Sequence, residues 1–90
     1  MADPSSSGSH PPQRLPLVVP ECGTGPLCVS LWLVQPGAMV RGGERVVELL
    51  AGGATIDLDA PADGRLVAQL VDEDDRVTPG QTIAEIEVMP

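Results

Sequence analysis

The sequence predicts an all-β domain, on the evidence of its turns, its apolar residues and an internal repeat. Ten glycines and ten prolines divide the 90 residues into short apolar runs, and runs of this length between turn residues are typical of strands. Trp32 is the only aromatic residue, so the core should be built from valine, leucine and isoleucine. We therefore expect strands joined by tight turns, and no helix.

The two halves of the chain resemble each other. A shift of 37 residues aligns the second half with the first, and five of the 23 pairs that start at residues 29 to 51 are identical. Each half is too small to bury its apolar face alone, so the halves should pack face to face with pseudo-twofold symmetry. The identical pairs are Leu33 and Leu70, Val34 and Val71, Val40 and Val77, Gly43 and Gly80, and Glu48 and Glu85.

The folded domain is expected to comprise residues 15–90. Residues 1–14 are rich in serine, glycine and proline, a composition that predicts a disordered tail. Leu15–Val19 is predicted as the first strand, at a sheet edge where its proline is tolerated. Leu27–Val34 is predicted as the second, and its four consecutive apolar residues indicate either a bulge or burial on both faces.

Glycine marks the tight turns that follow. Residues 35–38 and residues 78–81 place proline and glycine at the two central positions of a type II turn. Gly52 and Gly53 separate two strand-like runs and predict a two-residue hairpin, in which positive φ is demanded. Because this hairpin lies between the repeats, it should protrude freely at the end opposite the chain termini.

The remaining strands are short, and one of them shows clean alternation. Within Thr55–Asp59, Ile56 and Leu58 should face the core while the polar residues face solvent. The other predicted strands are Met39–Val40, Arg45–Leu50, Arg65–Val71, Arg76–Val77 and Thr82–Val88.

Charge and hydropathy exclude several kinds of partner. The chain contains no lysine, its net charge is −8, and residues 72–75 form an acidic turn. Nucleic acids and anionic membranes would be repelled, because their binders need clusters of basic residues. A basic protein surface would be attracted, although a solvated loop is the simpler interpretation of the acidic turn. No run is apolar enough to span a bilayer and no signal peptide is visible, so a cytoplasmic location is expected.

Neither a catalytic site nor a metal site is predicted. The only histidine, His10, lies in the predicted tail, which argues against zinc and against histidine-assisted nucleophilic catalysis. Cys22 and Cys28 could form a disulfide, but two reduced thiols are the favoured interpretation.

The remaining candidates also have structural interpretations. Asp57 and Asp59 are interpreted as the solvent-facing side of a strand and not as a catalytic pair. Glu48 and Glu85 are interpreted as equivalent positions of the two repeats, with a structural role. Trp32 is interpreted as a half-buried packing residue. Leu31 is either a single exposed apolar residue or part of a small contact patch.

Several segments, taken in order, resemble the biotinyl/lipoyl attachment domain. Residues 32–40 are similar to the family's Trp-Leu-Val-x-x-Gly-Asp-x-Val stretch, and residues 60–64 to its Ala-Pro-x-x-Gly segment. Residues 77–81 and 83–87 are similar to its closing turn and strand. The resemblance covers residues 15–88 and implies a flattened barrel, or barrel-sandwich hybrid, of two four-stranded antiparallel sheets.

The resemblance also implies that the attachment lysine is missing. The lipoyl branch carries Asp-Lys-Ala at the hairpin tip and the biotinyl branch Met-Lys-Met, whereas this chain has Gly52, Gly53 and Ala54. Trp32 and Glu48 are more similar to the lipoyl branch. In the family the lysine ε-amine is joined to lipoate or biotin, and at the lysine position Gly53 has no side chain to acylate. We therefore expect no cofactor, and only a vacated attachment turn.

Two functions follow from the resemblance. The favoured one is a non-catalytic, monomeric lipoyl-like domain, related to the lipoyl domains of 2-oxoacid dehydrogenase acyltransferases and kept as a protein-interaction or structural module. Its expected partner is a component of a 2-oxoacid dehydrogenase or a carboxylase. The alternative is a lipoyl, less readily biotinyl, swinging-arm carrier of a multienzyme complex whose lysine has been deliberately substituted.

Overall fold

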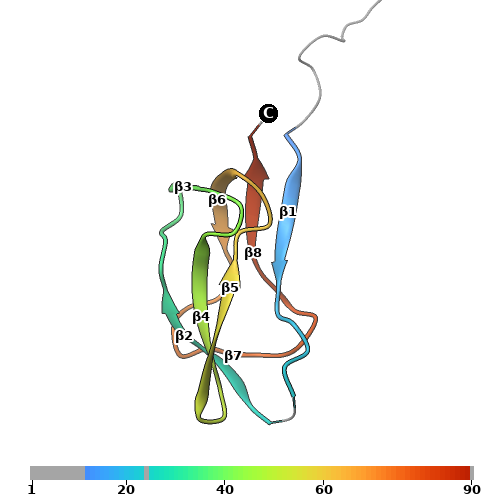
Figure 1. Ribbon diagram of the computed structural model, residues 1–90, viewed down its shortest axis with the longest axis vertical. Coiled ribbons are helices and arrows are strands. Elements are labelled where there is room, and N and C mark those ends of the chain that lie inside the picture. Colours follow the sequence, from blue (N-terminus) through green and yellow to red (C-terminus); the bar gives the residue numbers. More distant parts are fainter. Residues whose placement is uncertain (1–11, 24, 90) are drawn as a thin grey trace, which may run out of the picture.

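Eight strands and no helix make up residues 12–23 and 25–89, the part of the chain that the computed structural model describes (Figure 1). Within that part there is accordingly no helix that could cross a membrane. Most of the tail predicted as disordered, residues 1–14, lies outside the described residues, which begin at residue 12, but Arg14 belongs to the first strand. The strands are β1 (Arg14–Val18), β2 (Leu27–Trp32), β3 (Met39–Val40), β4 (Arg45–Ala51), β5 (Ala54–Asp59), β6 (Gly64–Gln69), β7 (Arg76–Val77) and β8 (Thr82–Val88).

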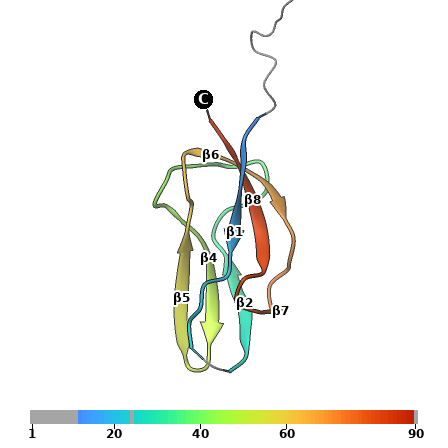
Figure 2. The same ribbon diagram turned by 90° about the vertical axis from the view of Figure 1, so that its right-hand side faces the viewer.

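The strands form two four-stranded antiparallel sheets, as predicted, in the orders β1-β8-β6-β3 and β5-β4-β2-β7. Figures 1 and 2 show the two layers from directions at right angles. The inward residues of both sheets form one aliphatic cluster, joined by Trp32. Its most deeply buried members are Val19, Val29, Val46, Val47, Leu49, Leu66, Ile83 and Ile86.

The pseudo-twofold symmetry extends to individual hydrogen bonds. A shift of 37 residues carries β2, β3 and β4 onto β6, β7 and β8 without a change of boundary. The amide of Gly37 donates to the Leu66 carbonyl (2.7 Å), and the equivalent amide of Asp74 donates to the Val29 carbonyl (2.8 Å). Even the irregularities repeat, because the β2–β4 pairing shifts register after Val29 and the β6–β8 pairing after Leu66. A bulge, one of the two alternatives for the second strand, is therefore present, with a counterpart in the other half.

Both predicted type II turns are also present. Gly37 and Gly80 have φ angles of 94° and 87°, which place the third residue of each turn in the left-handed region. The Ala38 amide donates to the Gln35 carbonyl (3.0 Å), and the Gln81 amide donates to the Thr78 carbonyl (3.0 Å). Each turn therefore has the hydrogen bond that closes it.

Three details of the prediction need correction. The first strand begins one residue early, at Arg14, because Arg14 lies opposite Glu87 of β8 and the Gln13 carbonyl accepts a hydrogen bond from Val88. β2 and β6 each end two residues early, because the chain turns there toward the other sheet. Trp32 is buried rather than half-buried, with 8% of its surface exposed, and its indole Nε1 donates to the Val71 carbonyl (3.1 Å).

The hairpin lies at the end of the molecule opposite the start of β1 and the end of β8, which agrees with the prediction. In Figure 1 the β4–β5 hairpin is at the bottom, whereas β1 begins and β8 ends at the top. Ala51 and Ala54 are the last residues that pair in the hairpin, so the turn consists of Gly52 and Gly53. The hairpin therefore presents its tip to solvent, away from the start of β1 and the end of β8.

Candidate functional site

The tip of the β4–β5 hairpin is an exposed turn with room around it. Only Gly52 adopts a left-handed conformation, with φ of 61°, whereas Gly53 is not among the residues with positive φ. This agrees with a two-residue turn that requires glycine at its first central position. A Cβ atom added to Gly53 would meet nothing within 4 Å. The backbone at position 53 can therefore carry any ordinary side chain.

The residues of this turn do not fit an attached prosthetic group. Amide attachment requires an amine, and residues 51–54 consist only of alanine and glycine. The chain has no lysine anywhere else that could take over the role. Since Gly53 has both space and an ordinary backbone conformation, the identity of the residue, and not the geometry of the turn, prevents attachment.

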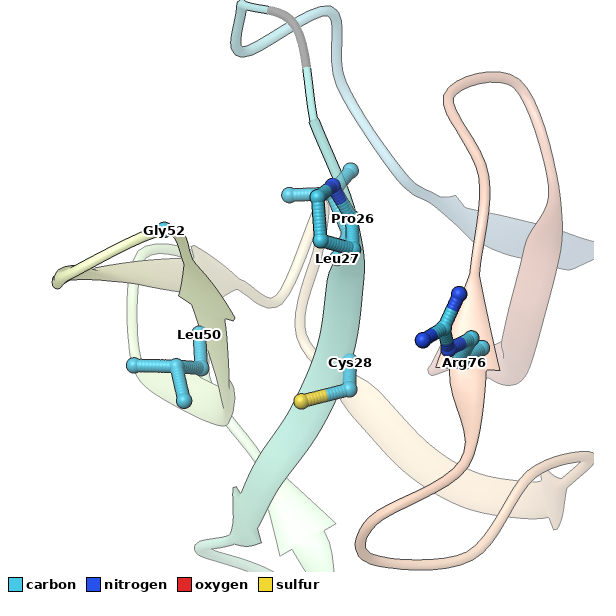
Figure 3. Close-up of a pocket in the computed structure, with 6 residues that line it drawn as sticks. All are labelled: Pro26, Leu27, Cys28, Leu50, Gly52 and Arg76. Atoms are coloured by element: carbon cyan, nitrogen blue, oxygen red, sulfur yellow. The ribbon is translucent and has the colours of Figure 1, made fainter.

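An open apolar groove of about 260 Å³ lies beside the hairpin (Figure 3). Three neighbouring strands contribute to it, with Leu50 from β4, Cys28 from β2 and Arg76 from β7. These residues lie opposite one another in register, so they form a row across the outer face of the sheet. The full lining is Pro26, Leu27, Cys28, Leu50, Gly52 and Arg76.

Sequence reasoning missed this groove, although part of the signal was available. Because successive residues of a strand face opposite sides of the sheet, an inward Leu49 would have implied an outward Leu50. Leu49 is fully buried and Leu50 is 40% exposed. The positions of Cys28 and Arg76 beside Leu50 could not be read in the same way, because they depend on which strands are neighbours.

The carboxylates weighed in the sequence analysis are spread over both sheets. Asp57 forms an ion pair with Arg45 (3.3 Å), and Asp59 lies opposite Arg45 in the β4–β5 register. Glu48 and Glu85 occupy equivalent positions in opposite sheets, and Glu85 pairs with Arg14 (3.4 Å). In the described part of the chain no three histidine, cysteine or acidic side chains gather into a potential metal site.

The two cysteines are both free and half-buried. The thiol of Cys22 donates to the Pro20 carbonyl (3.4 Å), whereas Cys28 lines the groove. His10 lies outside the described residues. The structure thus brings Cys28 together with Leu50 and Arg76, but it does not join the two cysteines.

Comparison with known proteins agrees with this architecture. The model of a family described as "Biotin-requiring enzyme" matches residues 16–89. The chain is similar in fold to the solution structure of the lipoyl domain of the 2-oxoglutarate dehydrogenase complex from Azotobacter vinelandii, with 24% identity and a TM-score of 0.60. That match covers 68% of this chain and 77% of the other. No curated protein matches the chain.

The family match covers all eight strands except the first two residues of β1. It also includes the β4–β5 hairpin, and relatives in this family carry lipoate or biotin. The two four-stranded antiparallel sheets and the similarity to a solved lipoyl domain agree with a barrel-sandwich fold. This protein belongs to the biotinyl/lipoyl attachment domain family.

Proposed function

We propose that this protein is a lipoyl-like domain that no longer carries a prosthetic group and acts as a non-catalytic protein-interaction or structural module. One observation carries the proposal: the attachment hairpin is intact, but Gly53 stands where an amine is required. We further propose that it works as a cytoplasmic monomer beside a component of a 2-oxoacid dehydrogenase or a carboxylase.

The state of the hairpin supports loss of attachment with the fold retained. Six registered pairs join β4 and β5, up to Ala51 and Ala54 at the tip. The turn has the glycine it needs at position 52, and the core beneath it includes the fully buried Leu49. Selection for carrying a prosthetic group would preserve a lysine at the tip of the hairpin. Selection for a protein-interaction or structural role would preserve only the fold of the hairpin.

The test is attempted modification of the purified chain. We expect no gain in mass after incubation with lipoate or biotin, ATP and the matching ligase, because no side chain in the chain offers an amine. The reporter variant is Gly53→Lys, which the open surroundings and ordinary φ of position 53 should tolerate. Ala54→Lys provides a matched control, with the amine displaced by one residue along the hairpin.

Intact-mass spectrometry distinguishes the outcomes. A mass gain on the unaltered chain would overturn the proposal. A gain on Gly53→Lys alone would show that only the acceptor residue has been lost. If Gly53→Lys is also acylated by a 2-oxoacid dehydrogenase as a true carrier is, the alternative of a carrier with a substituted lysine gains support over the interaction module.

A further inference from the structure

We propose that the outer face of the β5-β4-β2-β7 sheet, beside the hairpin, docks a segment of a partner protein that carries lysine or arginine next to aliphatic side chains. The docking face consists of Leu31, Leu50 and Cys28 together with Glu48 and Asp57. This inference rests on the proposed interaction function and specifies the site and chemistry of the contact.

The apolar part of the docking face is exposed without a packing role. Leu31 and Leu50 are 44% and 40% exposed, whereas the core residues beside them in the strands, Trp32 and Leu49, are 8% and 0% exposed. Leu50 lines the groove of about 260 Å³, and Leu31 lies further along β2 on the same face. A partner that covers two such leucines and the groove would remove apolar surface from water, which favours binding.

The charged part of the docking face is unbalanced. Glu48 lies between Leu31 on one side and Asp57 on the other, so two carboxylates stand directly opposite each other in the sheet. Like charges in this arrangement are destabilising. Arg45 reaches Asp57 (3.3 Å), but Glu48 has no ion-pair partner among the described residues. A partner cation placed between the two carboxylates would relieve this repulsion.

The other sheet provides an internal comparison, because it has the same fold. The position equivalent to Leu50 is Glu87, which lies between Arg14 and Arg65 in the register. The position equivalent to Glu48 is Glu85, which pairs with Arg14 (3.4 Å). Opposite charges therefore alternate on that face. The fold therefore does not require an exposed leucine at position 50 or an acidic residue without an ion-pair partner at position 48.

Charge decides between the occupants of this face. A second copy of the chain would bring the same carboxylates against each other at a net charge of −8 per chain. Nucleic acids and anionic lipids would be repelled for the same reason. A protein segment with basic and aliphatic residues matches both the carboxylates and the leucines. Of these occupants, only this kind of partner is complementary to both the leucines and the carboxylates; Arg76, the cation that lines the groove beyond Cys28, is not part of the docking face.

The experiment is an NMR titration of the full ¹⁵N-labelled chain with a short peptide of alternating lysine and leucine. We expect amide shifts concentrated on β2, β4 and β5. Leu50→Ser and Glu48→Gln should each raise the dissociation constant about fivefold, by loss of an apolar contact and of a charge contact. The controls are Leu70→Ser, which removes a leucine elsewhere that is 54% exposed, and Glu85→Gln, at the equivalent position of the other sheet.

Both controls should leave the dissociation constant within about twofold of the unaltered chain, a difference well below one kcal/mol. A lysine–serine peptide should bind at least about fivefold more weakly, since it lacks the aliphatic contacts. Equal binding of the two peptides, or equal effects of Glu48→Gln and Glu85→Gln, would show general attraction to an acidic protein and sink the docking face. Shifts confined to the other sheet, or self-association through β2 and β4, would do the same.

The docking face and the loss of attachment can fail separately. A chain that accepts lipoate but binds the peptide at β2, β4 and β5 overturns only the loss of attachment. A chain that stays unmodified but binds elsewhere overturns only the docking face. The ¹⁵N spectrum of each variant also reports whether its fold is intact, so a weakened contact is distinguished from an unfolded domain.

Discussion

At the scale of single residues, Asp74 is a position where the two halves differ, because a glycine stands at the equivalent position of the first half. It occupies the position equivalent to Gly37 and has a φ of 73°, the only positive φ outside glycine in the described part of the chain. A left-handed conformation costs an L-residue free energy, although aspartate tolerates it better than most. Its amide nevertheless donates to the Val29 carbonyl as the Gly37 amide does to Leu66. The hydrogen bond to Val29 thus helps to hold Asp74 in a left-handed conformation that aspartate does not prefer.

We predict that Asp74→Gly raises the free energy of unfolding by about 0.5–1 kcal/mol, because glycine adopts this conformation without steric cost. Urea denaturation followed by Trp32 fluorescence measures the change. The reciprocal variant Gly37→Asp should lower stability by a similar amount. Unchanged stability in both variants would mean that the left-handed conformation carries no strain at either turn.

At the scale of strands, the repeat made much of the fold predictable. All eight strands were expected, because turn residues bound each apolar run and because each half supports the assignment of the other. Strand ends were less certain, since Arg14 joins β1 only through its partner Glu87. The β4–β5 turn could be located from its two glycines and from the resemblance. The groove could not, because Leu50, Cys28 and Arg76 come together only through the order of three strands.

The close pairing of β6 with β8 at Gly64 allows a second prediction. A Cβ atom at Gly64 would collide with the Glu87 carbonyl oxygen and approach the Ile86 side chain (2.9 Å). Gly64→Ala should therefore lower the free energy of unfolding by about 2–3 kcal/mol, because a packed strand must move to make room.

Gly53→Ala is the matched control for this change. Position 53 has open space and an ordinary φ, so the substitution should be neutral or stabilising by up to about 1 kcal/mol. Thermal or urea unfolding of the two variants measures both effects. If the two alanine variants are equally stable, β6 and β8 are not in tight contact at Gly64.

At the scale of the whole molecule, the charge is large for a small domain. A net charge of −8 on 90 residues opposes the compact state through self-repulsion. Two exposed ion pairs, Arg14 with Glu85 and Arg45 with Asp57, offset little of this, because pairs of this kind are weak in water. The repulsion among the acidic residues therefore outweighs the attraction within the two ion pairs, and the net effect of charge is to destabilise the folded state.

Added salt should accordingly stabilise the protein. We predict that raising NaCl from about 10 mM to about 150 mM, which shortens the Debye length from about 30 Å to about 8 Å, increases Tm by about 4 °C. Circular dichroism during heating measures the shift. A fall in Tm would mean that the two ion pairs outweigh the repulsion, and removal of Arg14 and Arg45 would then abolish the fall.

The separation of the hairpin from the chain ends has a practical consequence. Any polypeptide fused to this domain, before β1 or after β8, leaves from the pole farthest from Gly53. A linker at either end of the domain would therefore leave the hairpin end exposed to solvent. A larger assembly could use the domain in this way to display a recognition surface where its relatives display a mobile arm.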